Sequence, residues 1–259
     1  MFKSLNTAAT GMEAQQRRID VTANNMANVN TTGFRRARAE FQDLLYQTVR
    51  APGGQTGDGA TLPTGLQIGQ GVRTAGTMTM HGQGTMNHTE NPLDIAIEGD
   101  GFFQVRRPNG DVAYSRAGNL KVDAQGQLVT IDGYQLEPQI SIPTDATGVT
   151  ITPDGLISVT VAGDTTAQEV GQLQLANFAN PAGLEAIGRS MFLPNNASGQ
   201  PIVGTPGQEG LGTLAQGFLE GSNVEVVTEM IDLITSQRAY EVNQKVIEAA
   251  DQMLERTTR

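Results

Sequence analysis

The residues in this 259-residue chain that are best suited to chemistry are two histidines and three carboxylates. His81 and His88 lie seven residues apart in a stretch rich in Gly, Thr and Met, a spacing that does not match a set of metal ligands. We therefore expect both imidazoles to be exposed or packed against other side chains. Asp94, Glu98 and Asp100 are close in sequence, but nothing nearby suggests the aromatic-lined cleft that would favour an acid/base pair.

Other patterns that could support catalysis are incomplete. The Gly-x-Gly sequences at 69–71 and 99–101 do not extend to a dinucleotide-binding or phosphate-binding loop, so we interpret both as turns. The chain has no Gly-x-Ser-x-Gly elbow. It also has no cysteine, which excludes disulfides and thiolate metal sites. The sequence predicts a protein that is not an enzyme and that has no catalytic residues, no cofactor and no metal.

Composition restricts the core and the partners. Hydrophobic residues make up 38% of the chain and aromatic residues only 5%, with no Trp, so we expect thin layers of Val, Ile, Leu and Ala. A net charge of -10 argues against nucleic acid as a partner. No stretch approaches the ~18 consecutive apolar residues of a membrane span. Residues 1–18 lack the apolar region of a secretory signal, so if the protein leaves the cytoplasm we expect a route that does not use a cleaved signal peptide.

The two ends of the chain differ from its middle in their content of glycine and proline. All 11 prolines and 30 of the 31 glycines lie between Gly33 and Gly221. Residues 12–32 and 222–259 contain neither, and we expect a helix in each. Two terminal helices around a Gly-rich middle can pair with each other and with neighbouring copies, which is the layout of a stacking subunit.

The N-terminal helix carries a narrow apolar repeat of seven residues, typical of a coiled-coil seam, at Leu5, Met12, Ile19 and Met26. An Asn cluster follows and includes Asn24, Asn25 and Asn28. These side chains either cap the helix end or form hydrogen bonds across helices that fix their register, and the sequence favours the two interpretations equally.

The C-terminal helix has two apolar rows. We expect it to begin with a capping box in which Ser222 is the N-cap and Glu225 lies three residues later. One partner helix would not cover both rows, so we infer more than one helical neighbour. The first row is Val226, Leu233, Tyr240, Ile247 and Leu254, and the second is Val227, Ile231, Ile234, Val242, Val246, Ala250 and Met253.

The middle of the chain favours β-structure. Asn109-Gly110, Asp132-Gly133 and Asp154-Gly155 are typical hairpin turns. Together with the short apolar strands 93–97, 102–105, 128–131, 149–151, 156–161 and 173–175, they predict an antiparallel sandwich or barrel-like domain. The segment 53–76 contains eight glycines and taken alone predicts a flexible linker.

Three blocks resemble bacterial flagellar rod and hook proteins. Residues 23–34, Ala-Asn-Asn-Met-Ala-Asn-Val-Asn-Thr-Thr-Gly-Phe, are similar to the N-terminal signature of that family. Residues 222–231, 237–240 and Asn243 resemble its closing helix, and residues 94–103 and 114–119 resemble a central block of rod and hook subunits. The chain length, with residues 46–54 and 61–69 that look like an insertion of the distal rod, indicates a subunit of the distal rod.

The resemblance implies an α+β fold in which paired N- and C-terminal helices form a coiled-coil-like domain beside an antiparallel all-β central domain. Residues 1–32 with 222–259 would form the inner tube, 33–82 an extended Gly-rich connection with the insertion, and 83–221 the outer β domain. We predict subunit-interface residues and insertion contacts. The first set is Leu5, Met12, Ile19, Asn24, Asn25, Met26, Asn28, Val226, Met230, Leu233, Tyr240, Ile247 and Leu254, and the second is Pro52, Gly53, Leu62, Pro63 and Leu66.

The function implied by the resemblance is structural. Copies would assemble helically into a rigid hollow drive shaft that spans the periplasm and transmits motor torque to the hook. The expected partners are further copies, proximal rod proteins below, hook protein above, the surrounding P-ring and L-ring proteins and the flagellar type III export apparatus. No nucleic acid and no membrane insertion are expected. The alternatives are a secreted binding module or adhesin with coiled-coil ends, which would form a closed oligomer, and an enzyme, which the residues do not support.

Overall fold

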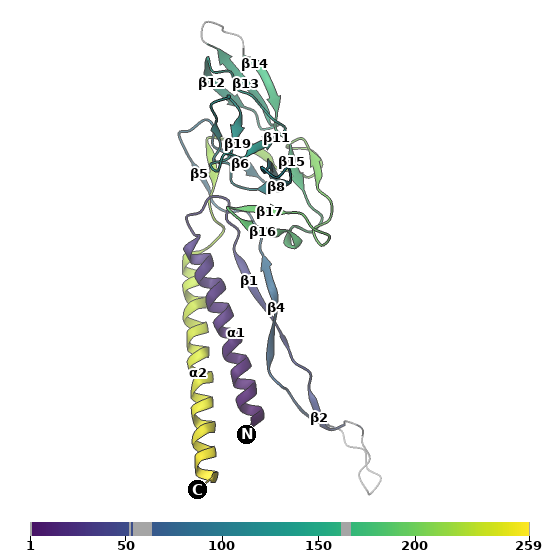
Figure 1. Ribbon diagram of the computed structural model, residues 1–259, viewed down its shortest axis with the longest axis vertical. Helices are drawn as coiled ribbons and strands as arrows, with labels where there is room; N and C mark the ends of the chain where they lie inside the picture. Colours follow the sequence, from purple (N-terminus) through teal and green to yellow (C-terminus); the bar gives the residue numbers. More distant parts are fainter. Residues whose placement is uncertain (1, 52, 54–63, 162–166, 259) are drawn as a thin grey trace. The chain divides into compact units, whose positions relative to one another are not determined.

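The computed structural model describes residues 2–51, 53, 64–161 and 167–258. The chain forms two compact units, which we call unit 1 (Met1–Met26, Ala37–Met78 and Glu225–Arg259) and unit 2 (Ala27–Arg36 and Thr79–Val224). The fold is α+β, with a helix at each end of the chain and a mostly antiparallel β region between them (Figure 1). The predicted fold class is confirmed in this broad form.

Unit 1 contains both helices, α1 (Phe2–Ala27) and α2 (Val226–Thr258). The N–H of Glu229 donates to the carbonyl of Glu225, 3.0 Å away, so Glu225 holds the cap position. The predicted capping box is therefore wrong. Ser222 accepts a hydrogen bond from the Val224 N–H instead, and the adjacent Asn223 side chain accepts one from the Arg36 N–H, because this part of the chain is extended within unit 2.

Unit 1 also contains a β-ribbon. Strand β1 (Ala37–Asp43) pairs with β4 (Val72–Thr79), and β2 (Gln47–Arg50) pairs antiparallel with β3 (Leu66–Ile68). Strand β3 and most of β4 fall in the segment 53–76, so its expected reading as a flexible linker is wrong for residues 66–68 and 72–76. Cross-strand pairing satisfies the backbone there despite the glycines.

Unit 2 is built on β-sheets. Its largest sheet runs β16 (Glu185–Gly188), β17 (Met191–Leu193), β8 (Val112–Ser115), β7 (Phe102–Arg106), β11 (Gln135–Glu137), β10 (Leu128–Val129) and β9 (Lys121–Val122), with β15 (Leu175–Asn177) on β7 and β18 (Ile202–Gly204) on β15. A second sheet consists of β12 (Ala146–Ile151), β13 (Leu156–Val161) and β14 (Gln168–Gln172). Strand β6 (Ile95–Glu98) pairs with β19 (Thr213–Gln216), and β5 (Met86–His88) pairs with β20 (Phe218–Glu220). A short 3-10 helix, η1 (Pro181–Gly183), follows β15.

All three predicted hairpin turns are confirmed. They connect β7 to β8, β10 to β11 and β12 to β13, and each of these strand pairs is antiparallel. Gly155 shows why one of these turns needs glycine. Its φ is +82°, and a Cβ there would lie only 2.8 Å from the carbonyl oxygen of Leu173.

The core of unit 2 has an aliphatic and an aromatic part. The main cluster consists of Ile, Leu and Val side chains with Phe103 as its one aromatic member, as the composition predicts. A second cluster, which the composition did not predict, contains Phe102, Tyr114, Phe178 and Phe192. Phe178 meets Tyr114 and Phe102 edge-to-face, with ring centroids 4.8 and 5.9 Å apart. Within the described ranges, neither helix is long and apolar enough to cross a membrane.

Candidate functional site

The two helices of unit 1 run antiparallel, with the chain termini at the same end of the pair (Figure 1). A Cβ on Gly11 would lie 3.0 Å from the Asn243 side chain. Further along, Arg18 Nη2 donates to Asp232 Oδ1 at 2.7 Å. Nearest the end of α1, Asn25 contacts Glu229. As the residue number rises in α1 it falls in α2, which defines the antiparallel direction.

The buried side chains of α1 and α2 are small or polar. The buried members of the two helices are Ala8, Ala14, Thr22, Asn25, Glu229, Ser236 and Ala250. The sequence prediction missed this seam because it relied on large apolar residues. The signal that could have found it is the spacing of seven that links Gly11, Arg18 and Asn25. A glycine within a helix lets a neighbouring helix approach closely.

Asn25 is the buried member of the predicted Asn cluster. It is 2% exposed. Its Nδ2 donates to the Ala37 carbonyl at 2.8 Å and to Glu229 Oε2 at 3.1 Å, while its Oδ1 accepts from the Ala37 N–H at 2.9 Å. Asn25 thus joins α1 to α2 and to the first residue of β1. Asn28 behaves differently, since its Oδ1 accepts a hydrogen bond from Thr31 in the turn after α1, and Asn24 is exposed.

The predicted interface residues divide into half-buried and exposed groups. The half-buried group is Leu5, Met12, Ile19, Met26, Asn28, Leu233, Ile247 and Leu254. The exposed group is Asn24, Val226, Met230 and Tyr240, and Asn25 alone is buried. Their contact with other subunits stays a prediction, because these positions describe a single chain.

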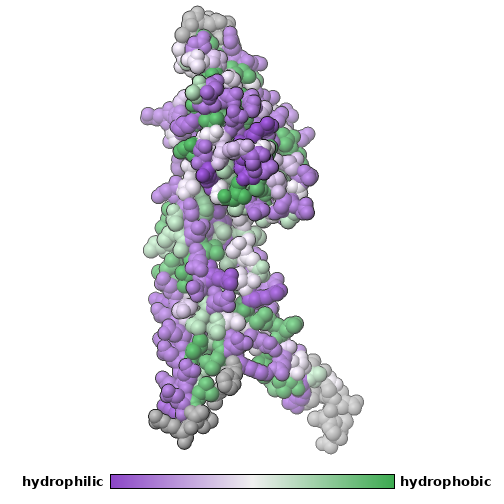
Figure 2. All heavy atoms as spheres, viewed as in Figure 1, coloured by the Kyte–Doolittle hydropathy of each residue, from purple (hydrophilic) through white to green (hydrophobic). Residues whose placement is uncertain are grey.

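An unpartnered apolar surface lies near the start of α2. We call Val227, Met230, Ile231 and Ile234 the α2 apolar face; their side chains are 45–66% exposed. The spacing i, i+3, i+4, i+7 places them on one side of the helix. At about 100° per residue, that side is roughly opposite the residues that contact α1. Figure 2 shows apolar atoms at the surface of this helical part between polar ones.

Most of the other residues of the second predicted row of α2 are exposed as well. Val242, Val246 and Met253 are also exposed, whereas Ala250 is buried. Ala250 therefore does not belong with the other members of that row.

A second apolar surface lies on the ribbon. Leu45, Tyr46, Val49, Leu66 and Ile68 are exposed although they are large and apolar, and we call them the ribbon patch. Of the predicted insertion contacts, Leu66 lies in β3 and Gly53 is exposed in a turn. Pro52, Leu62 and Pro63 lie outside the described residues.

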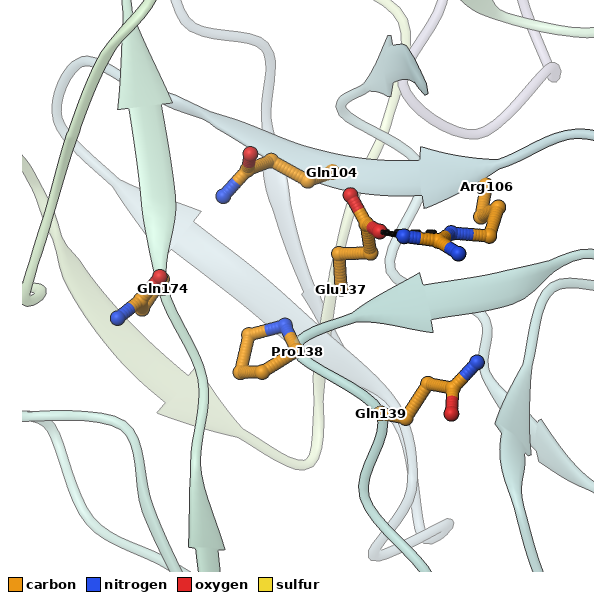
Figure 3. A pocket seen from close by; sticks show the side chains of 6 residues that line it. All are labelled: Gln104, Arg106, Glu137, Pro138, Gln139 and Gln174. Atoms are coloured by element: carbon orange, nitrogen blue, oxygen red, sulfur yellow. Dashed lines mark hydrogen bonds and ion pairs between the residues drawn. The ribbon is translucent and has the colours of Figure 1, made fainter. Parts of the chain in front are cut away.

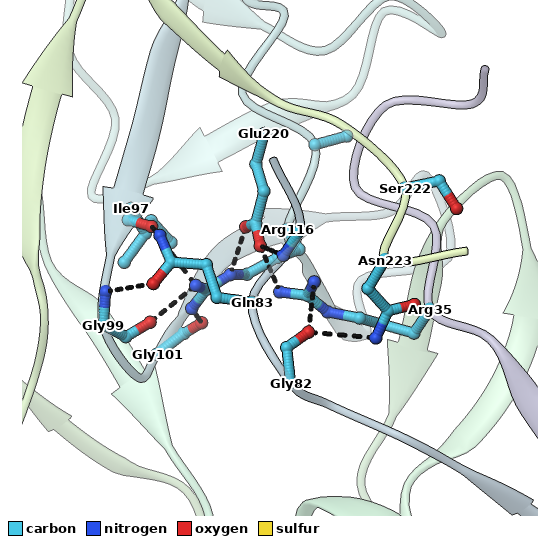
Figure 4. Close-up of polar contacts among 12 residues, drawn as sticks. Arg35, Gly82, Gln83, Ile97, Gly99, Gly101, Arg116, Glu220, Ser222 and Asn223 are labelled. Carbon is cyan, nitrogen blue, oxygen red and sulfur yellow. Dashed lines mark hydrogen bonds and ion pairs between the residues drawn. The ribbon is translucent and has the colours of Figure 1, made fainter. Parts of the chain in front are cut away.

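Unit 2 contains a buried ionic cluster that the sequence did not reveal (Figure 4). The Glu220 side chain is 0% exposed and lies between Arg35, 1% exposed, and Arg116, 4% exposed. Arg35 Nη2 and Arg116 Nε lie 2.8 and 2.7 Å from the two carboxylate oxygens. Burial lowers the pKa of Arg35, and the Glu220 carboxylate opposes that shift. Such a group is stable only while its charges remain paired.

The same cluster ties together distant parts of the chain. Arg116 also donates to the carbonyl oxygens of Gly99 and Gly101. Arg35 donates to the Gly82 carbonyl at 2.9 Å, and the Glu220 carboxylate accepts from the Gly84 N–H at 2.8 Å. The cluster therefore joins five segments of unit 2 that are separate in sequence, at residues 35, 82–84, 99–101, 116 and 220. Its residue types are common on surfaces, so their burial could not be read from the sequence.

His81 packs beside this cluster. Its ring meets Phe102 and Phe192 edge-to-face, with centroids 5.6 and 5.4 Å apart, so the prediction of a packed histidine is confirmed. Burial lowers the pKa of His81 to about 4, and the positive charge of Arg35 adds to the shift. His88 is exposed and contacts Phe218.

The lowered pKa of His81 predicts acid sensitivity. Since its pKa is about 6.5 in the unfolded chain and about 4 in the folded one, the unfolded chain binds the proton first. This contribution to stability is complete above pH 6.5 and is lost as the pH falls toward 4. We expect a loss of about 2–3 kcal/mol between pH ~7.5 and ~4.5, measured by urea unfolding. His81→Leu should remove this part of the pH dependence and His88→Leu should keep it; parallel profiles for wild type and His81→Leu would contradict the assignment.

Asp94, Glu98 and Asp100 do not form a site together. Asp94 is buried, and its two oxygens accept from Thr89 Oγ1 and Asn91 Nδ2 at 2.8 and 2.9 Å. Glu98 and Asp100 are exposed. Within the part of the chain that the structure describes, no group of three or more His, Asp or Glu could hold a metal ion.

The two exposed apolar surfaces of unit 1 and the buried ionic cluster of unit 2 are typical of a structural protein that assembles with other copies. Family models match along the chain: "Flagella basal body rod protein" at residues 5–35, "Flagellar hook protein FlgE/F/G D1 domain" at 96–159 and "Flagellar basal body rod FlgEFG protein C-terminal" at 215–259. The chain belongs to the family of the flagellar basal-body rod protein FlgG.

The relatives with that name cover the whole chain or nearly all of it. The protein of Caulobacter vibrioides is 51% identical over 100% of this chain and 99% of its own length. That of Buchnera aphidicola from Acyrthosiphon pisum is 47% identical, with both chains fully covered. The Bacillus subtilis protein is 38% identical over 98% of this chain and 97% of its own. The resemblance found in the sequence is confirmed, and so is the prediction of a structural protein of the basal-body rod and not an enzyme.

Proposed function

We propose that this protein is the structural subunit of the distal part of the flagellar rod. Copies assemble helically into a rigid hollow shaft that transmits motor torque to the hook. The observation that carries this proposal is the α2 apolar face, which no other part of the described chain covers. The full-length match to rod proteins supports it.

The free energy of assembly comes from covering this face. Fully burying a side chain of this kind contributes about 1.5–3 kcal/mol. These four side chains are about half exposed, so each would contribute roughly half of that, and the remaining free energy of assembly comes from other contacts. Because the face differs from the surface it meets, each added copy presents a new binding surface and the polymer continues to grow.

In this proposal the helices pair as a coiled-coil-like domain, formed by residues 1–32 and 222–259, that lines the inner tube. Residues 83–221 form the outer β domain, and 33–82 connect them and carry the insertion. The contacts of Arg18 with Asp232 and of Asn25 with Glu229 support the pairing. The predicted interface residues of both helices then meet neighbouring copies.

The ribbon patch serves as a second contact in the polymer. Two-stranded ribbons are only marginally stable alone. A neighbouring subunit would stabilise the ribbon by packing against its exposed Leu45, Tyr46 and Val49.

Leu66→Asp tests the role of the ribbon patch. Leu66 is 50% exposed, so the change should leave the fold intact, with an effect within about 0.5 kcal/mol. A buried carboxylate in the polymer would instead weaken each contact, and the shaft should become bent or fragmented in electron micrographs of basal bodies. Thr48→Asp, on the partner strand, is the control for added charge. Straight, full-length rods in the Leu66→Asp strain would show that the ribbon patch is not a contact between subunits.

The other expected partners follow from this place in the flagellum. The subunit contacts proximal rod proteins below and hook protein above, and the P-ring and L-ring proteins surround the shaft where it spans the periplasm. The flagellar type III apparatus exports it without a cleaved signal peptide. Complementation of a strain that lacks its own rod subunit tests the whole proposal: swimming and complete basal bodies should return, and rods that lack this chain would contradict it.

A further inference from the structure

Strand β7 carries two different strands along one edge. Its other edge is occupied by β8. On the shared edge β15 pairs with the first half, where Leu175 lies opposite Phe103, and β11 with the second half, where Glu137 lies opposite Gln104. The chain must therefore leave the sheet after Glu137 and join it at Leu175. A cleft of about 400 Å³ opens at this fork (Figure 3).

Polar side chains line the cleft. They are Gln104, Gln139, Gln174, Arg106 and Glu137, with Pro138 as the single apolar member. Gln104 is only 8% exposed, and the accessible part of its side chain faces the cleft. Among the described residues, its amide makes no hydrogen bond. The amide is open to the cleft, so its donor and acceptor are available to a ligand that takes the place of solvent there.

The lining selects a neutral ligand. Arg106 Nε donates to Glu137 Oε1 at 2.7 Å, so the two charges of the cleft neutralise each other. Amide side chains offer donors and acceptors side by side, which suits hydroxyl and acetamido groups. The Pro138 ring offers one apolar surface for the C–H face of a sugar ring.

A docked peptide fits this cleft less well. Peptides that add to a sheet need a free strand edge and pockets for alternate side chains. Both edges of β7 are already paired, and the lining is polar except for Pro138.

We propose that this cleft binds one N-acetylated sugar unit. The acetamido carbonyl accepts a hydrogen bond from Gln104 Nε2, while the acetamido N–H points the opposite way and donates to another oxygen of the lining. Gln139, Gln174 and Glu137 bind ring hydroxyls. This site is independent of the assembly function, because none of its residues belongs to the α2 apolar face or the ribbon patch.

The test is ligand-observed NMR of the full-length protein with N-acetylglucosamine. We expect millimolar binding, which is typical of a small ligand with few contacts, and a loss of about tenfold or more in Gln104→Leu. Gln125→Leu, at an exposed turn outside the cleft, should bind as wild type does. If Gln104→Leu melts at a lower temperature, Gln174→Leu gives the same comparison at an exposed position.

Two further ligands decide what the cleft recognises. Glucose lacks the acetamido group and should bind about tenfold more weakly than N-acetylglucosamine. N-acetylalanine methylamide carries the amide without a sugar ring and should bind more weakly as well. The proposal is overturned if this peptide amide binds as well as the sugar, if the cleft variants bind as wild type does, or if N-acetylglucosamine gives no signal at its solubility limit.

Discussion

Replacing Glu220 by Gln should destabilise unit 2 by about 3–5 kcal/mol. The carboxylate is fully buried and lies within 2.8 Å of a guanidinium nitrogen on each side. The amide of Gln cannot neutralise either cation, so two positive charges would remain buried close together. The change should also weaken the contacts between the segments that the cluster joins, since the Gly84 N–H loses a charged acceptor.

Urea unfolding followed by circular dichroism measures this effect. The midpoint should fall sharply in Glu220→Gln. Glu185→Gln, which removes a carboxylate from an exposed strand position, is the matched control and should change stability by less than about 0.5 kcal/mol. Equal midpoints for the two variants would show that the cluster does not hold unit 2 together.

Ile231→Asp should abolish assembly while the chain stays folded. Ile231 is 56% exposed within the α2 apolar face, so an aspartate there is solvated in the isolated chain. In the polymer the same carboxylate would be buried without a partner, at a cost of several kcal/mol for every copy. Since each subunit repeats the defect, the loss accumulates along the shaft.

Electron microscopy of basal bodies and a swimming assay in soft agar report the result. The Ile231→Asp strain should have no distal rod and should not swim, although the purified variant keeps the helix content of wild type. Gln252→Asp adds the same charge at an exposed polar position of α2 and should allow swimming. A motile Ile231→Asp strain would mean that the α2 apolar face is not an interface.

The sequence predicted local structure correctly where one residue type dictates the backbone conformation. The glycines of the three hairpin turns, with Asn or Asp before each, placed strand pairs correctly because only a few turns suit that chemistry. The freedom of residues 222–259 from glycine and proline located α2, although the helix begins four residues later than Ser222.

The rest depended on contacts between distant residues. The seam between α1 and α2 uses Gly11, Arg18 and Asn25, which carry no hydrophobic periodicity. The partners of Glu220 are 185 and 104 residues away in sequence, taken as the differences 220 − 35 and 220 − 116, so no local pattern marks the cluster. The ribbon folds because its strands pair with each other, which overrides the flexibility suggested by its glycines.

In the proposed assembly, this chain builds the distal rod through its terminal helices. Cryo-electron microscopy of basal bodies from the source organism, with this chain traced in the density, tests it most directly. The chain should form the straight shaft below the hook, with α1 and α2 in the inner wall and the α2 apolar face against a neighbouring copy. Density that places the chain in the curved hook or near the motor, or that leaves the α2 apolar face exposed in the shaft, would contradict it.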